Sequence, residues 1–246
     1  MSPTFFASKL KPPDYLIIDD KNDVYHISKV LRIEKGDQLQ VNYDSKLYLT
    51  LVEKVNDKEI TCKIVSEIGD KESKVNIYLC QSLPKKDKWE LILEKCTELG
   101  VFAFIPLQTQ RSIVNLTKEE FEKKYVRWNK IIRETVKQCG RNFVPNLFNV
   151  LNLEECLRLA KEEKADILVA WEGAKEDLKK VFENGVKDKV FLFIGPEGSF
   201  SEEEIEMMRN FGGKFFNMGP RILKVDTAAI VSSALLLYEK GGLGLL

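Results

Sequence analysis

The sequence predicts a two-part α/β protein, with a small N-terminal β-barrel followed by a larger domain built on a mostly parallel sheet. Three observations support this prediction. The first ~70 residues contain closely spaced runs rich in β-branched and aromatic residues. From Val75 onward, short apolar strands alternate with helical patterns. A polar stretch, Gly69 to Ser73, lies between the two. We therefore assign the barrel to residues 1–72 and the α/β domain to residues 74–246.

The barrel is predicted from four strands that are separated by short turn sequences. Lys35-Gly36-Asp37, Tyr43-Asp44-Ser45 and Asn56-Asp57-Lys58 are rich in residues that favour turns. The runs between them show partial alternation of apolar and polar side chains, which is typical of half-buried strands. The predicted strands are Tyr15–Ile18, Leu39–Tyr43, Leu47–Val55 and Glu59–Ile68.

The second domain is predicted from alternating strands and helices. Apolar residues recur at helical spacing between Lys85 and Leu99, and Gly100 follows as a stop signal. Thr117 and Glu120 form a capping-box pattern that opens a long helix, and Ser201 with Glu204 repeats the pattern. The last helix runs from about Thr227 to Tyr238. The predicted strands are Val75–Gln81, Val101–Pro106, Ile167–Trp171, Val190–Ile194 and Phe215–Met218.

Composition excludes several classes of protein. The chain has 246 residues, 38 basic against 38 acidic side chains, and 44% hydrophobic residues, as expected for a folded globular protein. The five cysteines are scattered and there is one histidine, so we expect reduced thiols and no metal centre. No apolar stretch approaches the ~20 residues of a membrane span, and residues 1–14 lack a secretory signal. These features predict a cytoplasmic protein with no membrane association.

The neutral total hides an uneven distribution of charge. Residues 73–145 contain 14 basic and 8 acidic side chains, whereas the regions on either side are acidic overall. Such a basic zone can bind a polyanion even when the net charge of the chain is zero. The alternative is that these lysines and arginines only solvate helix surfaces.

Two Gly/Pro-containing segments follow predicted strands and are candidates for a ligand site. They are Gly195 to Phe200 and Gly219 to Lys224. In open α/β sheets, ligands bind beyond the carboxyl ends of the strands, where glycine allows close approach of the backbone. The chain lacks the phosphate-loop motif and the glycine fingerprint of nicotinamide enzymes. Two such segments at one sheet edge therefore favour a small-molecule site of another kind over two ordinary turns.

These segments closely resemble motifs of the RsmE family of 16S ribosomal RNA uridine-N3 methyltransferases, which belong to the SPOUT superfamily. Gly195-Pro196-Glu197-Gly198 matches the family's G-P-E-G motif, and Gly219 to Leu223 matches its L-G-x-R-I-L motif. His26 with Val30-Leu31-Arg32, and Lys95 to Val101, match two further motifs in the correct order. The sequence departs from the family at Ser199, Lys224 and Asp226, and its N-terminus lacks the usual early arginine.

The resemblance implies a trefoil-knotted sheet domain, an N-terminal barrel of PUA-like or OB-like type, and S-adenosylmethionine as the methyl donor. It also implies a homodimer formed through the last helix, whose apolar residues cover most of its circumference. The expected substrate is 16S ribosomal RNA of the small subunit. The implied cofactor-binding residues are Glu172, Ile194, Gly195, Pro196, Glu197, Gly198, Met218, Gly219, Arg221, Ile222, Leu223, Thr227 and Ala228.

Methyl transfer to uridine N3 requires that the N3 proton be removed or that the resulting anion be stabilised. Arg221 is the candidate for anion stabilisation or phosphate positioning, and Asp226 or Glu197 is the candidate base. The structural alternatives are a loop hydrogen bond for Glu197 and an N-cap of the last helix for Asp226. No metal is needed, because the methyl group of a sulfonium is already activated.

The basic zone and the barrel supply the predicted RNA contacts. His26 is expected either to pack in the barrel or to touch RNA. A related SPOUT enzyme acting on another RNA atom, and a non-catalytic RNA-binding protein with the same fold, remain alternative functions. The predicted RNA-binding residues are Lys29, Arg32, Lys85, Arg111, Arg127, Arg133 and Arg141.

Overall fold

The computed structural model describes residues 4–69, 71–85, 88–114 and 116–243. The chain folds into two compact units, residues 1–72 with 134–144, and residues 73–133 with 145–246. The sequence assigned residues 134–144 to the second domain, but in the structure they pack with the first unit. Polar contacts hold residues 134–144 in the first unit, because the Asn42 amide donates to the carbonyl of Asn142 and the Glu72 carboxylate accepts from Arg141.

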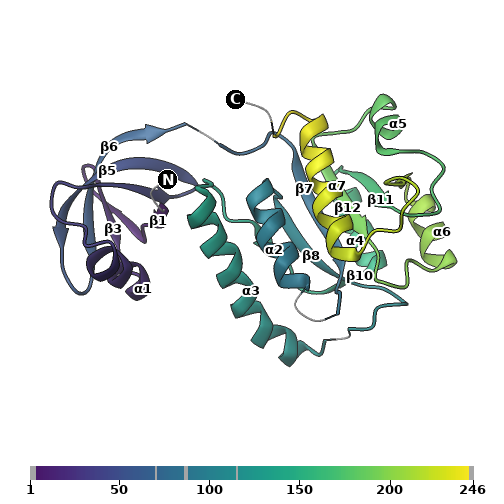
Figure 1. Ribbon diagram of the computed structural model, residues 1–246, viewed down its shortest axis with the longest axis horizontal. Coiled ribbons are helices and arrows are strands. Elements are labelled where there is room, and N and C mark those ends of the chain that lie inside the picture. Colours follow the sequence, from purple (N-terminus) through teal and green to yellow (C-terminus); the bar gives the residue numbers. More distant parts are fainter. Residues whose placement is uncertain (1–3, 70, 86–87, 115, 244–246) are drawn as a thin grey trace. The chain divides into compact units, whose positions relative to one another are not determined.

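The first unit is a curled sheet (Figure 1). It has six strands in the order β1-β4-β5-β6-β3-β2. Its pairs are antiparallel, except that β1 runs parallel to β4. The four predicted strands are β3 to β6, and the predicted small barrel takes the form of an open, curled sheet. The strands are β1 (Thr4–Phe6), β2 (Lys9–Lys11), β3 (Tyr15–Ile18), β4 (Gln38–Tyr43), β5 (Lys46–Val55) and β6 (Ile60–Ile68).

The long strand β5 explains the curl of this sheet. Asp44 and Ser45 join β4 to β5 with φ of 51° and 58°, the two-residue hairpin whose twist matches that of the strands. Register shifts against β6 at Leu49/Thr50 and Val52/Lys54 bend the strand, as β-bulges do. The sheet therefore wraps around a buried core whose members are Phe5, Leu16, Ile18, Val24, Ile27, Leu39, Val41, Val52, Ile60 and Cys62.

A short helical segment that the sequence did not predict follows β3. Helix α1 (Lys21–Tyr25) is capped by the Asp20 carboxylate, which accepts from the N–H groups of Asn22 and Asp23 at 3.0 and 3.1 Å. It continues directly into a π-helical turn, η1 (His26–Val30). Five-residue helices are too short to give a periodic apolar pattern, so the cap at Asp20 was the available signal.

The second unit contains a parallel seven-stranded sheet with the order β10-β8-β7-β12-β11-β13 and β9 beside β8. The predicted strands correspond to β7 (Asn76–Ser82), β8 (Ala103–Gln108), β11 (Asp166–Ala170), β12 (Lys189–Ile194) and β13 (Lys214–Phe216). The short strands β9 (Asn146–Leu147) and β10 (Leu151–Asn152) were not predicted. The predicted mostly parallel sheet is confirmed.

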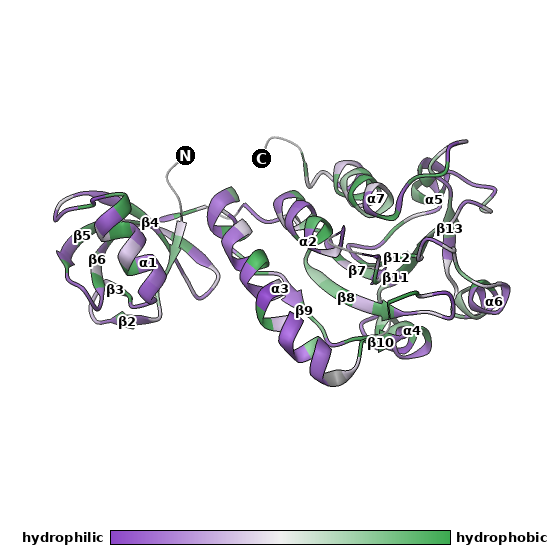
Figure 2. Cartoon of the chain, turned by 60° about the horizontal axis from the view of Figure 1, so that its bottom comes forward, coloured by the Kyte–Doolittle hydropathy of each residue, from purple (hydrophilic) through white to green (hydrophobic). Residues whose placement is uncertain are grey.

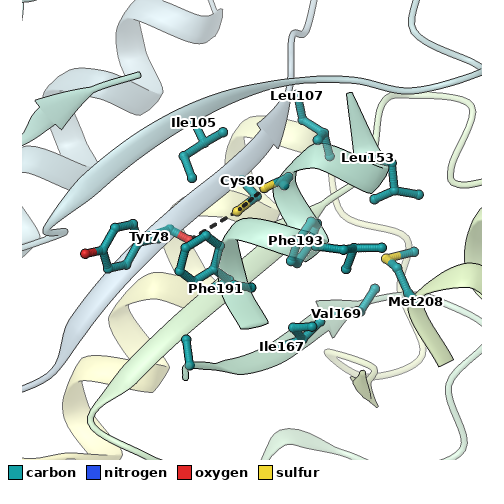
Figure 3. Packing of buried hydrophobic residues seen from close by; sticks show 14 of the residues in the cluster. Tyr78, Cys80, Ile105, Leu107, Leu153, Ile167, Val169, Phe191, Phe193 and Met208 are labelled. Carbon is teal, nitrogen blue, oxygen red and sulfur yellow. Dashed lines mark hydrogen bonds between the residues drawn. The ribbon is translucent and has the colours of Figure 1, made fainter. Parts of the chain in front are cut away.

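Helices cover both faces of this sheet, so its strands are apolar on both sides (Figure 2). Helices α2 (Lys88–Leu99) and α7 (Val225–Glu239) pack together, and α7 contacts β7 and β12. Helices α4 (Leu153–Glu162) and α6 (Glu202–Asn210) cover the cluster in Figure 3, where Tyr78 stacks on Phe191 at 4.5 Å between ring centroids. The remaining helices are α3 (Lys118–Cys139) and α5 (Leu178–Glu183).

The capping boxes predicted from sequence are present in α3 and α6. Glu120 N–H donates to the Thr117 hydroxyl and Thr117 N–H donates to the Glu120 carboxylate, at 3.2 and 2.9 Å. Ser201 and Glu204 make the same reciprocal pair. Helix α4 has a third capping box, between Asn152 and Glu155, which the sequence reading overlooked. The cap fixes where α6 begins, directly after the Gly195–Phe200 loop.

Candidate active site

A cavity of about 280 Å³ lies at the carboxyl ends of three neighbouring strands of the second unit. Loops that leave β11, β12 and β13 form most of its wall, and the first residues of α2 and α7 complete it. This is where parallel sheets bind ligands, because loops from adjacent strands converge there. The lining residues are Lys88, Ala170, Trp171, Glu172, Ile194, Gly195, Pro196, Glu197, Ser199, Phe200, Met218, Gly219, Arg221, Ile222, Leu223, Lys224, Val225 and Ala228.

The cavity brings together most of the residues predicted to bind the cofactor. Of these residues, Gly198 and Thr227 do not line it, and the candidate base Asp226 does not line it either. The predicted residues that do line it are Glu172, Ile194, Gly195, Pro196, Glu197, Met218, Gly219, Arg221, Ile222, Leu223 and Ala228.

The backbone of the two predicted loops depends on glycine at two positions. A Cβ on Gly195 would lie 3.2 Å from the ring of Phe200, so this residue allows the loop to fold against that side chain. Gly219 has φ of 95°, in the left-handed region that side chains disfavour, and its Cα faces open space. Its N–H donates to the Asn217 amide oxygen at 3.1 Å. The β13–α7 loop thus turns sharply at the mouth of the cavity.

Arg111 stabilises the Gly195–Phe200 loop through hydrogen bonds to its backbone. Its Nη1 donates to the carbonyl oxygens of Gly198 and Phe200 at 3.0 and 3.3 Å. The loop that carries Arg111 is fixed in turn, because the hydroxyls of Ser82, Thr109 and Ser112 lie within 2.7–3.1 Å of one another. Arg111 was predicted to bind RNA, and the structure gives its guanidinium two carbonyl partners within the protein.

Positive charge surrounds one side of the cavity. Arg221 is exposed, and its guanidinium has no hydrogen-bond or ion-pair partner among the residues that the structure describes. Lys224 is also exposed and lies at the N-cap of α7 without a side-chain cap. Lys88 is paired, with its Nζ 3.1 Å from Asp226 Oδ1. The uncapped first turn of α7 adds the positive end of a helix dipole to these cations.

Asp226 does not cap the last helix, so that interpretation is wrong. The helix begins at Val225, which puts Asp226 inside the first turn, where it pairs with Lys88. Partial burial raises the pKa of the Asp226 carboxyl, but the hydrogen bond and charge of Lys88 outweigh this effect, and the net pKa is lowered. A carboxylate with a lowered pKa is a weaker proton acceptor.

Glu197 makes the loop hydrogen bond that was its structural alternative. Its Oε1 accepts from the backbone N–H of Lys85 at 3.2 Å, which ties the loop after β12 to the loop after β7. The Lys85 side chain is exposed. Glu197 therefore joins two loops of the site while its carboxylate also lines the cavity.

The site residues that sequence reasoning missed come from three places. Lys88 begins α2, more than 80 residues before the loops, and nothing in its local sequence connects it to them. Trp171 directly follows β11, so its position after a strand was the available signal. Ala170 and Val225 were also not predicted, whereas Ser199, Phe200 and Lys224 lie within the two predicted segments.

The other predicted RNA-binding residues divide between the two units. In the first unit, Lys29 and Arg32 are exposed, and Lys29 Nζ lies 3.9 Å from Asp57. In the second unit, Arg133 is exposed, and Arg127 is exposed but donates to Glu90 at 2.6 Å.

Arg141 is the exception among these residues. It is buried in the first unit, and its guanidinium is paired with Glu72. A phosphate could reach it only by displacing this carboxylate, so we do not retain Arg141 among the RNA contacts.

Within the described ranges, no group of three or more His, Cys, Asp or Glu side chains is arranged to hold a metal ion. No helix of the described part of the chain is long and apolar enough to cross a bilayer. The cavity described above is lined by backbone groups, apolar side chains and separate charged side chains.

Comparison with known proteins identifies the family. Residues 71–237 match the RNA methyltransferase domain family, and residues 18–65 match the RNA methyltransferase PUA domain family. Ribosomal RNA small subunit methyltransferase E of Bacillus subtilis (strain 168) is 32% identical over 227 residues, which is 88% of each chain.

Two solved structures share the fold. Ribosomal RNA small subunit methyltransferase E of Neisseria gonorrhoeae, bound to S-adenosyl methionine, superposes with a TM-score of 0.84, 25% identity and coverage of 97% of this chain and 98% of that chain. A Legionella pneumophila protein with bound SAM gives 0.82, 31% identity and the same coverage. These matches agree with the order of the sequence motifs, with the PUA-like curled sheet and with the parallel SPOUT-type sheet. The chain therefore belongs to the RsmE family of RNA methyltransferases.

Proposed function

We propose that this chain is an S-adenosylmethionine-dependent methyltransferase that methylates N3 of a specific uridine in 16S ribosomal RNA of the small subunit. The observation that carries the proposal is the cavity at the carboxyl ends of β11, β12 and β13, built by the loops that also carry the family motifs. In this reading residues 1–72, together with residues 134–144, form an RNA-binding domain, and the rest of residues 74–246 form the methyltransferase domain. The protein would act in the cytoplasm, where ribosomal RNA is found.

The residues of the cavity suit such a methyl donor. Its volume of about 280 Å³ is just below the ~300–1,000 Å³ range of ligand pockets. Ile222 lines it and is 89% exposed, and a bound adenine ring would cover this large apolar side chain. The backbone of the three loops supplies donors and acceptors for the polar edge of the ring. The uncapped start of α7 and the nearby cations favour the donor's carboxylate.

When bound, S-adenosylmethionine supplies a methyl group that a nucleophile can displace from a sulfonium. The chain's own residues orient the two reactants and exclude water. Arg221, with its free guanidinium, would stabilise the negative charge that develops on uracil as N3 loses its proton. Lys88 lowers the pKa of the Asp226 carboxyl, which makes this group a poor proton acceptor. Its role in this proposal is to position Lys88 beside the cavity, and Glu197 is the carboxylate at the cavity wall that could accept the proton.

RNA would be held by exposed cations of both units. Lys29 and Arg32 belong to the first unit, and Arg127, Arg133 and the Lys85 side chain to the second. Phosphate contacts of this kind position RNA without reading its sequence. Arg111 would act indirectly, by fixing the loop that lines the cofactor cavity.

The test of the function is titration calorimetry with S-adenosylmethionine, followed by methylation of naked 16S RNA and of isolated small subunits. Mass mapping of the nucleosides is expected to find one methyl group on N3 of one uridine. A methyl group on a ribose 2′-oxygen would instead indicate a related SPOUT enzyme. Absence of cofactor binding would favour a non-catalytic RNA-binding protein, and either outcome would overturn the proposal.

We infer further that the protein is a homodimer and that the loops after β11, β12 and β13 are part of the trefoil knot that the family resemblance implied. One stripe of α7 supports the dimer. Ile230, Val231 and Ala234 are partly exposed, Leu235 is 41% exposed, and Tyr238 is exposed, at spacings that put them on one face of the helix. A second copy of the stripe would cover this apolar face.

Leu235→Glu is expected to convert the dimer to a monomer, because it introduces a charge at the centre of the apolar stripe. Sedimentation velocity measures the change. Val126→Glu is the matched control, since Val126 is an exposed apolar residue on α3 and its replacement is expected to leave the dimer intact. Sedimentation of the unmodified protein as a monomer would contradict the proposal.

A further inference from the structure

The first unit contains a cavity of about 440 Å³ that shares no lining residue with the cofactor site. Thr4 and Phe5 of β1, Asp23 of α1 and His26 of η1 form one part of its wall. The rest comes from the last two turns of α3, which belong to the same unit. These α3 residues are Glu134, Lys137 and Gln138.

The inner wall of this cavity is polar and incompletely hydrogen-bonded. Thr4 is fully buried, and its hydroxyl has no hydrogen-bond partner among the residues that the structure describes. The Asp23 side chain is 6% exposed, and its Oδ1 accepts from Lys137 Nζ at 2.7 Å. No residue in the described part of the chain donates to its Oδ2. A buried hydroxyl without a hydrogen-bond partner is destabilising, so such a group points to a ligand that completes it.

The charges of the cavity select against anions. Asp23 and Glu134 are both acidic, and both lie within 3.0 Å of the single ammonium group of Lys137. Burial raises the pKa of the Asp23 carboxyl despite this lysine, as expected when the carboxylate is not fully compensated. A phosphate group would meet two carboxylates, whereas a neutral ligand with N–H donors would find acceptors.

An aromatic pair forms another side of the cavity. The rings of Phe5 and His26 meet edge to face, with 5.9 Å between centroids and 71° between planes. Phe5 is buried in the sheet core, and His26 is half-buried and therefore available at the cavity. His26 also begins the π-helical turn, a rare conformation that is frequently found at functional sites.

We infer that this cavity binds one unstacked nucleobase of the RNA substrate and selects a base that carries an exocyclic amino group. The base stacks on His26, its amino group donates to Asp23, and the Thr4 hydroxyl completes a second hydrogen bond. Proteins read single-stranded RNA in this way, by stacking splayed bases on aromatic rings and bonding their edges. Adenine, cytosine and guanine offer an amino group to a carboxylate, whereas uracil has none. The inference rests on the proposed RNA substrate, because it assigns the base to that RNA.

The test uses four fluorescein-labelled RNA hexamers, U-U-X-U-U-U, in which X is A, C, G or U. Binding to the full chain is measured by fluorescence anisotropy at one salt concentration. We expect at least one amino-bearing base at X to bind about five- to tenfold more tightly than U, the effect of roughly one hydrogen bond.

Thr4→Val is the most informative variant, because a structural role and a ligand role predict different results. Replacing an unpartnered buried hydroxyl by a methyl group of similar shape is expected to keep or raise the Tm. It is also expected to weaken binding of the preferred hexamer about fivefold. Thr50→Val is the matched control, since the Thr50 hydroxyl donates to the Leu39 carbonyl at 3.0 Å within the sheet. This variant is expected to lower the Tm and leave the base preference unchanged.

Two further variants separate stacking from selection. His26→Ala is expected to weaken all four hexamers by about tenfold, because stacking on an aromatic ring does not depend on the base. Asp23→Asn is expected to reduce the preference among bases, since an amide replaces the acceptor. Equal affinity of the unmodified protein for all four hexamers, or an unchanged preference in Thr4→Val and Asp23→Asn, would overturn the inference.

Failure of this inference differs from failure of the proposed function. A preparation that binds S-adenosylmethionine and methylates RNA, but shows no base preference in the hexamers, would overturn only the nucleobase pocket. A preparation that keeps the base preference but does not bind the cofactor would overturn only the methyltransferase assignment.

Discussion

Arg221→Ala is expected to lower the methylation rate at saturating S-adenosylmethionine by about 10²–10³-fold. This is the effect of removing one preorganised group that stabilises negative charge in a transition state. Arg221 lines the cavity, and no carboxylate or carbonyl in the described residues occupies its guanidinium. Its charge is therefore available to a substrate that becomes anionic. The rate is best measured in single turnovers at saturating cofactor, so that product release does not mask the step.

Two controls define what Arg221 contributes. Arg221→Lys keeps the charge but loses the planar fork, and we expect it to recover part of the rate. Arg158→Ala removes an arginine of α4 whose guanidinium already pairs with Glu154 on the same helix, and the rate should be unchanged. A near-normal rate for Arg221→Ala with normal RNA binding would remove Arg221 from the catalytic machinery.

The candidate site was largely predictable because a general rule of parallel sheets connects sequence to space. Loops that follow the strands of a parallel sheet leave at the same edge, so Gly195 to Phe200 and Gly219 to Lys224 could be assigned to one site from the sequence, although β11 lies between the two strands that precede them. Lys88 could not be assigned to this site from the sequence. It lies near these loops because β12 is inserted between β7 and β11, and a single sequence does not reveal this strand order.

Counting charges along the chain predicted the RNA-binding residues less accurately than the strand rule predicted the cavity. Arg111 and Arg141 both lie in the basic zone, but their guanidinium groups bond to protein atoms, to loop carbonyls in one case and to Glu72 in the other. A count of charges does not record such long-range pairing. The same limitation applies to residues 134–144, whose place in the first unit depends on polar contacts with Asn42 and Glu72. Short elements such as α1 and α5 were missed because they are too brief to show a period.

Glu72→Ala is expected to lower the free energy of unfolding of the first unit by about 3–5 kcal/mol, the effect of breaking a buried ion pair by removing one partner. The Glu72 carboxylate accepts from Arg141 Nε at 3.0 Å and from the backbone N–H groups of Asn142 and Phe143 at 2.9 and 3.1 Å. Arg141 is buried, so alanine at position 72 would remove the Glu72 carboxylate from its guanidinium and deprive two backbone N–H groups of this acceptor. Urea unfolding followed by circular dichroism, with hydrogen exchange of β4 to β6, measures the loss.

Comparison with a surface pair and with a double variant separates burial from charge. Glu67→Ala breaks an exposed pair with Lys46 in the same unit and is expected to change the free energy by less than about 1 kcal/mol. Replacing both partners, Glu72→Leu with Arg141→Met, removes the buried charge instead of isolating it, and should cost less than Glu72→Ala alone. The result matters for function as well as stability, because Glu72 holds the end of α3 in the unit that contains the nucleobase pocket. If Glu72→Ala unfolds at the same urea concentration as the unmodified protein, this carboxylate is not what fixes residues 134–144 to the sheet.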